Sequence, residues 1–449
     1  MGRLEGLTFK INVFGCQMNL NDGELLSGML ARAGAVEAAE EADADVVVYL
    51  TCCVREKADT RVFGQIASIR SLPVRDGSPI GRRVVAVGGC IGQRDGELLL
   101  ERLPNVDIVF GTHNLEDLPG LVWEAVTDSA RQARLRDDRA PYEADEPKVR
   151  KSAFHAWLPI MKGCNNFCTY CIVPYVRGRE MSRPIEGIVE EARSLVEDGV
   201  REITLLGQNV NSYGRDLYGS PRFAEVLRRV GDTGIERLRF VTSHPKDLVD
   251  ETIAAMAETP AVMPALHLPV QSGSDRVLAA MNRGYTAASY LETVAKIRER
   301  VGDIAFSTDV IVGFPGETAD DFQRTYELVR EVGYSQVFTF IYSKRAGTPA
   351  AEMPDDTPRE EIQERFDRLV ELVQASAFEQ NQKELGATVD VLVEGWSKRD
   401  DAMMAGRSPK NQTVHFPCPE DEDPAGLVGQ IVPVNVDVAK TWYLSGQRA

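Results

Sequence analysis

Three cysteines stand within one short run of this sequence, KGCNNFCTYCIVPYVRGRE, directly after an apolar strand pattern. They are Cys164, Cys168 and Cys171. A structural zinc site is normally closed by a fourth cysteine or histidine, and this loop contains no histidine. Three thiolates on one loop instead suit an iron–sulfur cubane in which one iron lacks a protein ligand. The spacing therefore predicts a cluster-binding loop at the end of a strand, with zinc binding as the alternative.

A second set of cysteines is dispersed along the first part of the chain. Cys16 follows the run FKINVF, Cys52 follows VVVYLT and Cys90 follows VVAVGG, so each stands at the carboxyl end of a predicted parallel strand. Because neighbouring strands lie about 4.8 Å apart, these loops can converge at one edge of the sheet, and we expect a second cluster there. Burial as small apolar side chains is the alternative. Adjacent residues on a strand point in opposite directions, so only one of Cys52 and Cys53 should face the cluster, and Cys418 is expected to be incidental.

The order of strand and helix signals divides the chain into three domains and a linker. Residues 1–127 alternate strands with helical segments, as a parallel α/β sheet does, and residues 128–151 form a charged linker. Residues 152–384 resume the alternation as a partial (β/α) barrel, whose functional residues should lie at the carboxyl ends of the strands. Residues 385–449 alternate at period two, which predicts a small β-barrel. The strand candidates of the first and third segments are 9–14, 45–50, 84–89, 158–162, 202–207, 237–242, 264–270, 305–313 and 336–342.

Composition limits the kind of partner that the chain can bind. Acidic residues outnumber basic ones by 68 to 51, a net charge of -17, which argues against non-specific coating of nucleic acid. No apolar stretch is long enough to span a bilayer, and the beginning of the sequence has no signal-peptide pattern. We therefore expect a cytoplasmic protein whose eight cysteines are metal ligands or thiols rather than disulfides.

The CxxxCxxC run resembles the signature of the radical S-adenosylmethionine superfamily, in which the unique iron of a 4Fe-4S cluster binds the cofactor. With GCQMN, TCCVREKA, GGC and the terminal barrel pattern, it resembles the methylthiotransferase family across essentially the whole chain. The segments TSHPKDL, HLPVQSGSDRVLAAMNRGYT and FTFIYSKRAGTPAAEM are similar to its tRNA-2-methylthio-N(6)-dimethylallyladenosine synthase branch. One departure is Leu50, which stands where the family usually has asparagine before Thr-Cys.

The resemblance implies an N-terminal cluster domain, a radical domain and an RNA-binding barrel of the TRAM type. The implied enzyme is a transferase that adds a methylthio group to carbon 2 of N(6)-isopentenyladenosine next to the anticodon in tRNA, with two 4Fe-4S clusters and S-adenosylmethionine as cofactors. The implied partners are tRNA and an electron donor such as a flavodoxin or ferredoxin, and we expect a monomer. Relatives acting on threonylcarbamoyladenosine of tRNA or on a ribosomal-protein aspartate are alternatives, as is a non-catalytic RNA-binding iron–sulfur protein.

Further residues are expected to contact the cofactor. Tyr170 occupies the aromatic position of the radical signature and should lie beside S-adenosylmethionine. The other candidates stand at the ends of strands in the barrel segment, where ordinary loop structure or capping is the alternative. They are Gly207, Gln208, Asn209, Ser243 and Gln271.

Two sets of basic residues have candidate roles. Lys162, Arg177 and Arg179 flank the cysteine run and either offset the negative charge of a cluster or meet RNA phosphates. The terminal domain has one basic concentration, which predicts an RNA-binding surface, with a solvated charged face as the alternative. Its members are Lys398, Arg399, Arg407 and Lys410.

Overall fold

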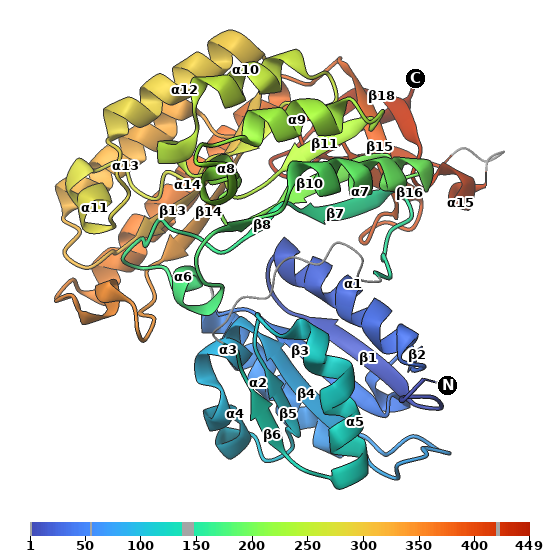
Figure 1. Cartoon of the computed structure of the whole chain (residues 1–449). Coiled ribbons are helices and arrows are strands. Elements are labelled where there is room, and N and C mark those ends of the chain that lie inside the picture. The colour runs from blue at the N-terminus through green and yellow to red at the C-terminus, as the bar shows by residue number, and fades with distance from the viewer. Residues whose placement is uncertain (1, 54–55, 137–147, 419–422) are drawn as a thin grey trace. The chain divides into compact units, whose positions relative to one another are not determined.

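The computed structural model describes residues 2–53, 56–136, 148–418 and 423–449, and the side chains of 56–61 are not described. The chain folds into two compact units (Figure 1). The first unit comprises Met1–Ser152, Lys162–Asn165 and Cys171–Arg183. The second unit comprises Ala153–Met161, Asn166–Tyr170 and Pro184–Ala449. The three-domain boundaries drawn from the sequence stay predictions.

Six parallel strands form one sheet in the described part of the first unit, in the order β2-β1-β3-β4-β5-β6. The strands are β1 (Thr8–Val13), β2 (Val36–Glu37), β3 (Val46–Thr51), β4 (Val84–Gly89), β5 (Ile108–Phe110) and β6 (Gln132–Arg134). The other elements of this unit are α1 (Gln17–Arg32), η1 (Glu41–Asp43), α2 (Glu56–Ser68), η2 (Ile69–Ser71), α3 (Cys90–Asp95), α4 (Glu97–Arg102), η3 (Leu115–Asp117), α5 (Leu118–Asp128), α6 (Val173–Val176) and β9 (Met181–Ser182).

Strands β3 and β4 are buried along their whole length, because helices cover both faces of the sheet. Apolar residues of α1 and α5 pack on one face, and those of α2, α3 and α4 pack on the other (Figure 1). The parallel α/β architecture predicted for the N-terminal part is therefore confirmed, and the three predicted strands lie within one residue of β1, β3 and β4.

Strand β6 lies inside the stretch 128–151 that was predicted to be a linker. It pairs in parallel with β5, and the Gln132 N–H donates to the carbonyl of Asp107. A strand of three residues at a sheet edge is too short to show a period-two pattern, so it could not be recognised from the sequence. Residues 137–147 of the same stretch lie outside the described residues.

Six described strands of the second unit form two parallel sheets, β11-β10-β7 and β12-β13-β14, which make up the predicted partial barrel. Their bounds are β7 (His155–Pro159), β10 (Glu202–Leu206), β11 (Arg237–Phe240), β12 (Ala265–His267), β13 (Ala305–Val312) and β14 (Gln336–Ile341), and β8 (Met161–Lys162) follows β7. The helices and turns are α7 (Ile185–Glu197), η4 (Val210–Ser212), α8 (Arg215–Tyr218), α9 (Phe223–Gly231), η5 (Pro245–Asp247), α10 (Asp250–Glu258), α11 (Asp275–Ala280), α12 (Ala287–Val301), α13 (Ala319–Val332), η6 (Pro349–Glu352) and α14 (Arg359–Gln382). Each strand candidate from the sequence overlaps a strand.

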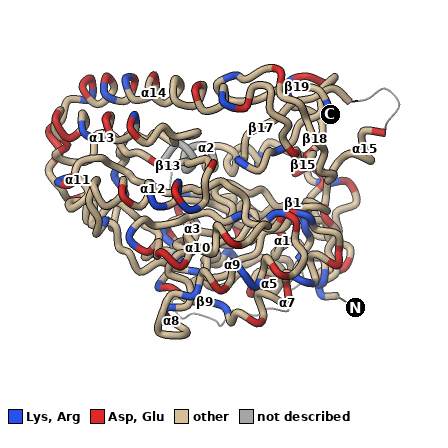
Figure 2. The backbone as a smooth tube through the Cα atoms, turned by 90° about the horizontal axis from the view of Figure 1, so that it is seen from above, with Lys and Arg blue, Asp and Glu red and all other residues tan. Residues whose placement is uncertain are grey.

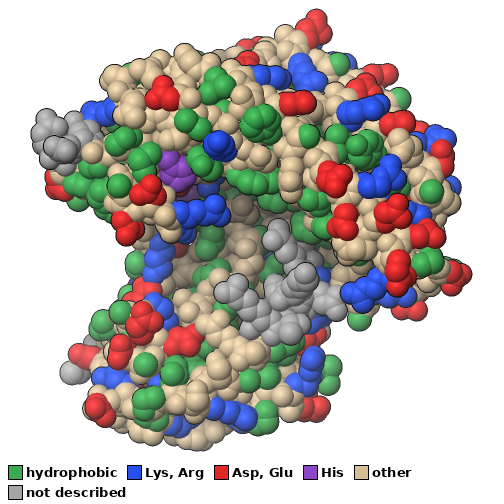
Figure 3. Space-filling model, turned by 180° about the vertical axis from the view of Figure 1, so that it is seen from behind, with side chains coloured by type: hydrophobic (Ala, Val, Ile, Leu, Met, Phe, Trp, Pro, Cys, Tyr) green, Lys and Arg blue, Asp and Glu red, His purple; other side chains and the backbone are tan. Residues whose placement is uncertain are grey.

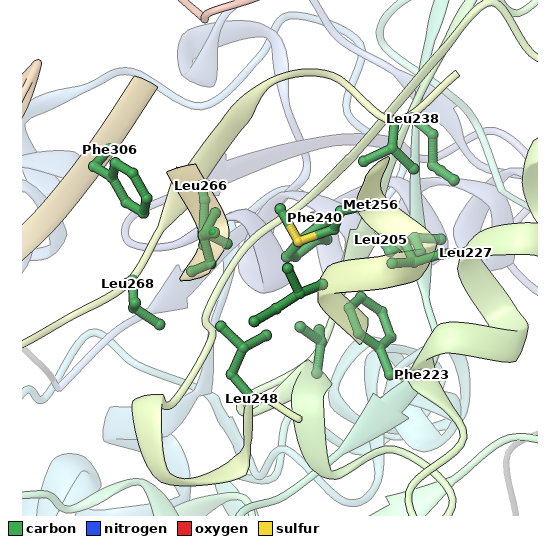
Figure 4. Close-up of a cluster of buried hydrophobic side chains, with 14 of the residues drawn as sticks. Leu205, Phe223, Leu227, Leu238, Phe240, Leu248, Met256, Leu266, Leu268 and Phe306 are labelled. Carbon is green, nitrogen blue, oxygen red and sulfur yellow. The ribbon is translucent and has the colours of Figure 1, made fainter. Parts of the chain in front are cut away.

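A large apolar cluster holds the strands of this barrel together (Figure 4). Leu205 of β10 and Phe240 of β11 pack with Phe223 and Leu227 of α9, and the rings of Phe223 and Phe240 meet edge to face with centroids 5.0 Å apart. This packing fixes the ends of β10 and β11, the two strands after which candidate cofactor residues follow.

Five described strands after α14 close a small barrel in the order β15-β16-β17-β19-β18, as predicted. They are β15 (Thr388–Trp396), β16 (Met403–Arg407), β17 (Thr413–Pro417), β18 (Ile431–Ala439) and β19 (Leu444–Arg448), with α15 (Pro424–Leu427) between β17 and β18. Acidic and basic residues both recur along α14 (Figure 2), as expected for a helix with one solvated face. No helix in the described residues is long and apolar enough to cross a membrane.

Candidate metal centre

The three dispersed cysteines stand at the same edge of the sheet in the first unit. Cys16 is the N-cap of α1 just after β1, Cys52 follows the last residue of β3, and Cys90 is the first residue of α3, directly after β4. These strands are neighbours, and their register places Val13 beside Leu50 and Thr51 beside Gly89. The carboxyl ends of three adjacent parallel strands therefore carry one cysteine each.

Two polar side chains that the sequence analysis did not single out connect the three loops. The Asn19 amide donates to the carbonyls of Phe14 (3.0 Å) and Thr51 (2.9 Å), which ties the Cys16 loop to the Cys52 loop. The Thr51 hydroxyl donates to the carbonyl of Gly88 (2.7 Å) and accepts from the N–H of Ile91 (3.2 Å), which ties the Cys52 loop to the Cys90 loop. Asn19 lies in GCQMN and Thr51 precedes Cys52, so only their nearness to cysteines hinted at this role.

Leu50, the departure from the usual family pattern, does not interrupt this framework. Its side chain is buried in the apolar cluster of the sheet, and its carbonyl accepts a hydrogen bond of 2.8 Å from the N–H of Phe14. The main chain at this position thus still joins β3 to the loop after β1.

Four thiols gather at this edge, and we call Cys16, Cys52, Cys53 and Cys90 the N-terminal thiol group. Cys52 hydrogen bonds to Cys16, and Cys53 hydrogen bonds to Cys90. Cys52 and Cys53 thus bond to cysteines on opposite sides of β3, and which of the two would face a cluster stays a prediction. Cys52, Cys53 and Cys90 are buried, whereas Cys16 is exposed.

Two of these thiols are poised to ionise. The hydrogen bond from Cys52 lowers the pKa of Cys16 to about 5, and the charge of Arg177 acts in the same direction. The hydrogen bond from Cys53, again aided by Arg177, lowers the pKa of Cys90 to about 7. The same hydrogen bond, together with burial, raises the pKa of Cys53. Because the thiolate is the form that binds metal, these shifts favour cluster binding at Cys16 and Cys90.

Arg177 is a buried cation within the first unit, only 6% exposed. Its guanidinium donates to Asn19 Oδ1 at 2.7 Å and to the Asp22 carboxylate at 3.1 Å, and it also hydrogen bonds to Cys90. Of its two candidate roles, burial favours compensation of cluster charge over contact with an RNA phosphate.

The donor set of the N-terminal thiol group is chemically compatible with an iron–sulfur cluster. Four thiols beside a buried guanidinium provide anionic sulfur ligands and a positive charge to offset them. The specific assignment of Cys16, Cys52 and Cys90 as ligands stays a prediction.

Gly15 allows this close approach of the loops. Its φ is +134°, and an added Cβ would lie 2.4 Å from Cys52 Cβ and 3.3 Å from Cys52 Sγ. We predict that Gly15→Ala displaces Cys52, lowers the free energy of unfolding by about 1–3 kcal/mol and reduces bound iron from about eight to about four per chain. Urea denaturation and iron analysis after anaerobic reconstitution measure both. Gly120→Ala, in α5 with open space around the added Cβ, is the matched control, and full iron content in Gly15→Ala would contradict the prediction.

The CxxxCxxC loop is divided between the two units, with Cys164 and Cys171 in the first and Cys168 in the second. In the first unit, the Cys164 N–H donates to the carbonyl of Gly178 at 3.0 Å. Gly163 has φ +79°, and an added Cβ there would lie 1.9 Å from the Arg179 carbonyl. In the second unit, Thr169 bonds to the carbonyls of Ala280 and Met281 at the end of α11.

The strand ends of the second unit carry buried polar atoms that lack partners. Asn209, after β10, donates to Asp247 at 2.7 Å, while its own Oδ1 has no partner in the described residues. The buried Ser243 hydroxyl, after β11, likewise has none there. Buried polar atoms are normally hydrogen bonded, so these two indicate a site for a polar ligand.

Backbone strain marks the same edge. Gln271 has φ +69° and Thr242 has φ +64°, conformations that residues other than glycine seldom adopt outside functional sites. Gly207 closes β10, and an added Cβ there would lie 2.7 Å from Met161 Cγ. Gln208 follows it, and Tyr170 packs in a smaller apolar cluster of the same unit. The roles of these residues as cofactor contacts stay predictions.

Two residues near Cys168 escaped the site prediction. Arg283 donates to Cys168 Sγ at 3.4 Å, and His244 Nε2 lies 4.0 Å from the same sulfur. Burial, together with the charges of Arg283 and Lys246, lowers the pKa of His244 to about 2, so its ring stays neutral. Both come from segments far from the cysteines in sequence, where nothing marked them as neighbours.

The four basic residues of the terminal barrel differ in their surroundings. Lys410 pairs with Glu384 at 2.7 Å and with Asp303, and Arg407 lies 3.5 Å from Glu394. Lys398 and Arg399, in the turn after β15, are exposed. Figure 3 shows acidic and basic side chains interspersed over one face of the molecule.

Comparisons with known proteins assign families to each part of the chain. The Radical SAM superfamily matches residues 158–329, the TRAM domain matches residues 382–448, and the Uncharacterized protein family UPF0004 matches residues 8–111. A tRNA-2-methylthio-N(6)-dimethylallyladenosine synthase of Acidothermus cellulolyticus is 49% identical over 91% of this chain and 82% of the relative. The enzyme of the same name from Carboxydothermus hydrogenoformans is 46% identical over 98% of both chains. The chain belongs to the tRNA-2-methylthio-N(6)-dimethylallyladenosine synthase family.

Solved structures agree with this family's fold. The radical S-adenosylmethionine methyltransferase TsrM from Kitasatospora setae has a TM-score of 0.56 at 16% identity, over 78% of this chain and 74% of that chain. The cobalamin-dependent S-adenosylmethionine radical enzyme OxsB has a TM-score of 0.52 at 14% identity, over 83% of this chain and 56% of that chain. The synthase family member described here thus combines a radical SAM domain, which uses S-adenosylmethionine and a 4Fe-4S cluster, with a TRAM barrel.

Proposed function

We propose that this chain is a tRNA methylthiotransferase that adds a methylthio group to carbon 2 of N(6)-isopentenyladenosine next to the anticodon. The observation that carries the proposal is the N-terminal thiol group with its buried guanidinium, in the same chain as a radical SAM domain. Its named relatives, 45–49% identical over nearly the whole chain, support the same reaction.

The proposal includes two 4Fe-4S clusters, one held by Cys164, Cys168 and Cys171 and the other by Cys16, Cys52 and Cys90. When bound, the clusters and S-adenosylmethionine supply a radical, a methyl group and a site for sulfur, which an aromatic C–H bond needs because it has neither an acidic proton nor a leaving group. The chain orients these groups: Asn19 and Thr51 hold the three N-terminal loops in register, and Arg177 offsets the charge of the thiolates.

The polar groups at the strand ends of the second unit are proposed to bind S-adenosylmethionine. Asn209 and Ser243 offer buried oxygens that have no partner among the described residues and suit its amino and hydroxyl groups. Gln271 follows β12, the main chain at Gly207 and Gln208 follows β10, and Tyr170 supplies an aromatic surface.

The remaining elements of the proposal concern partners and location. A flavodoxin or ferredoxin is proposed as the electron donor, the chain is proposed to act as a monomer, and a reducing compartment, the cytoplasm, suits its thiols. Lys398 and Arg399 are proposed to contact tRNA phosphates together with Arg407 and Lys410.

The decisive experiment measures the product directly. Anaerobic incubation of the reconstituted enzyme with S-adenosylmethionine, a reductant and isopentenylated tRNA, followed by mass spectrometry of the nucleosides, should yield 2-methylthio-N(6)-isopentenyladenosine. Modification of threonylcarbamoyladenosine or of a ribosomal-protein aspartate instead would contradict the proposed substrate. Iron and sulfide analysis should give about eight irons per chain, whereas a zinc protein would carry almost none.

A double charge reversal tests the RNA surface. Lys398→Glu with Arg399→Glu should raise the KM for tRNA by about tenfold and reduce the slope of log affinity against log salt by about two, since two phosphate contacts are lost. Lys296→Glu, on the exposed face of α12, is the matched control and should change neither value. Equal effects of the two changes would show that general charge, rather than this turn, governs tRNA binding.

A further inference from the structure

Arg283 is a charged residue in one of the most buried positions of the second unit. It is 4% exposed, and its guanidinium has four hydrogen-bonding partners. Nη2 donates to the Pro269 carbonyl at 2.8 Å, Nε donates to the Tyr285 hydroxyl at 3.0 Å, and Nη1 lies 3.4 Å from both Cys168 Sγ and the Tyr170 hydroxyl. In the described residues, Arg283 has no carboxylate partner.

A buried cation without an anion is costly. Removing a guanidinium from water costs several kcal/mol unless a negative group pairs with it. Two other buried arginines, Arg177 and Arg365, have carboxylate partners in Asp22 and Glu317, whereas Arg237 donates to main-chain carbonyls. The carbonyl and hydroxyl contacts of Arg283 do not require charge, because a neutral amide can make them. A thiolate at Cys168, 3.4 Å from Nη1, would offset the cost of burying this charge.

Among the neighbours named above, the Cys168 sulfur is the one that binding to iron would make anionic. The Tyr285 hydroxyl donates to the Val270 carbonyl at 2.8 Å, and burial raises the pKa of Tyr285, so it stays neutral. A cysteine bound to iron, in contrast, is a thiolate.

We propose that Arg283 is the counter-ion of the Cys168 thiolate and thereby sets the reduction potential of the cluster that this cysteine helps to hold. The inference rests on the proposed function, in which Cys168 is a cluster ligand. Arg283 does not touch the metal and acts through the sulfur, as a positioning residue. It affects the cluster through its charge and through its hydrogen bond. The guanidinium lowers the energy of added negative charge, and its N–H bond to sulfur withdraws electron density from the metal; both make reduction easier.

The experiment isolates the radical cluster in a parent chain that carries Cys16→Ala, Cys52→Ala and Cys90→Ala, so that about four irons remain after reconstitution. Midpoint potentials are measured by reductive titration followed by electron paramagnetic resonance. Arg283→Gln should shift the potential negative by at least about 59 mV, the equivalent of a tenfold loss in the reduction equilibrium constant. Arg283→Lys, which keeps the charge, should have a midpoint potential close to that of the parent chain.

Arg237→Gln is the matched control. Arg237 is 2% exposed, and its guanidinium donates to the carbonyls of Arg407 and Asp390, at the opposite end of β11 from the candidate cofactor residues. This variant should lose stability but keep the parent potential. An unchanged potential in Arg283→Gln, or an equal shift in Arg237→Gln, would overturn the inference.

Iron content separates the remaining outcomes. A folded Arg283→Gln chain that holds no iron, beside an Arg283→Lys chain that does, supports the need for a cation at this position. Loss of iron in both variants overturns it, because it shows that the fork of hydrogen bonds matters and the charge does not. A parent chain without iron would instead contradict the proposed function, and the inference with it.

Discussion

Replacing Arg177 with methionine should lower the free energy of unfolding by about 3–5 kcal/mol, because Asp22 would be left as a buried, unpaired charge. Both partners are nearly inaccessible, at 6% and 5% exposure of their side chains, so solvent does not screen the loss. Asn19 Oδ1 and the Cys90 sulfur lose a donor at the same time. Denaturation of the metal-free protein in urea measures the stability change, and iron content after reconstitution should fall from about eight toward four.

Two further variants give this prediction its control. Arg82→Met breaks an ion pair of similar length in the same unit, 2.8 Å to Asp107, but with side chains 32% and 14% exposed, so it should cost less than about 1 kcal/mol. Adding Asp22→Asn to Arg177→Met should recover part of the lost stability by removing the unpaired carboxylate. If Arg177→Met and Arg82→Met cost the same, the buried pair does not have the role described.

Removing one cysteine from each set should separate the two halves of the reaction. Cys168→Ala should abolish both 5'-deoxyadenosine and the modified nucleoside, a loss of at least about a thousandfold, because two protein ligands do not hold the radical cluster. Cys90→Ala should abolish the methylthio product while 5'-deoxyadenosine still forms, since the radical SAM cysteines are intact. Chromatography of the cofactor products and mass spectrometry of tRNA nucleosides measure the two outcomes.

Cys418→Ala is the comparison for both cysteine variants. This residue packs against the apolar core of the terminal barrel and belongs to neither cysteine set. Its loss should leave both products unchanged. Retention of methylthio product in Cys90→Ala would show that Cys53, its hydrogen-bonding neighbour, replaces it as a ligand or that the site is not a cluster.

The sequence predicted the architecture well because its strongest signals are local. Each long strand is a compact β-branched run, and the cysteines follow β1, β3 and β4 directly, so their common edge could be inferred from strand ends alone. The short edge strands β2 and β6 carry too few residues for any periodicity, and they escaped detection.

The contacts that organise the site lie beyond such local signals. Arg177 and Asn19 are 158 residues apart in sequence, and Arg283 and Cys168 are 115 apart. A charged side chain gives no sign in the sequence of whether it will be buried, so Arg177 kept two candidate roles and Arg283 had none. The turn of the chain after Thr51, which brings Cys53 to Cys90, likewise depends on where β3 ends.

The segment Cys171–Arg183 belongs to the first unit, although it follows the first residues of the second unit in sequence. Ile172 and Val176 fill its apolar core, the Val176 carbonyl accepts from the Thr112 hydroxyl, and Arg177 pairs with Asp22. A recombinant fragment ending at Ser152 would therefore expose a gap in its interior and leave Asp22 without its cation. In chimeras between relatives, the first unit should therefore be exchanged only together with residues 171–183.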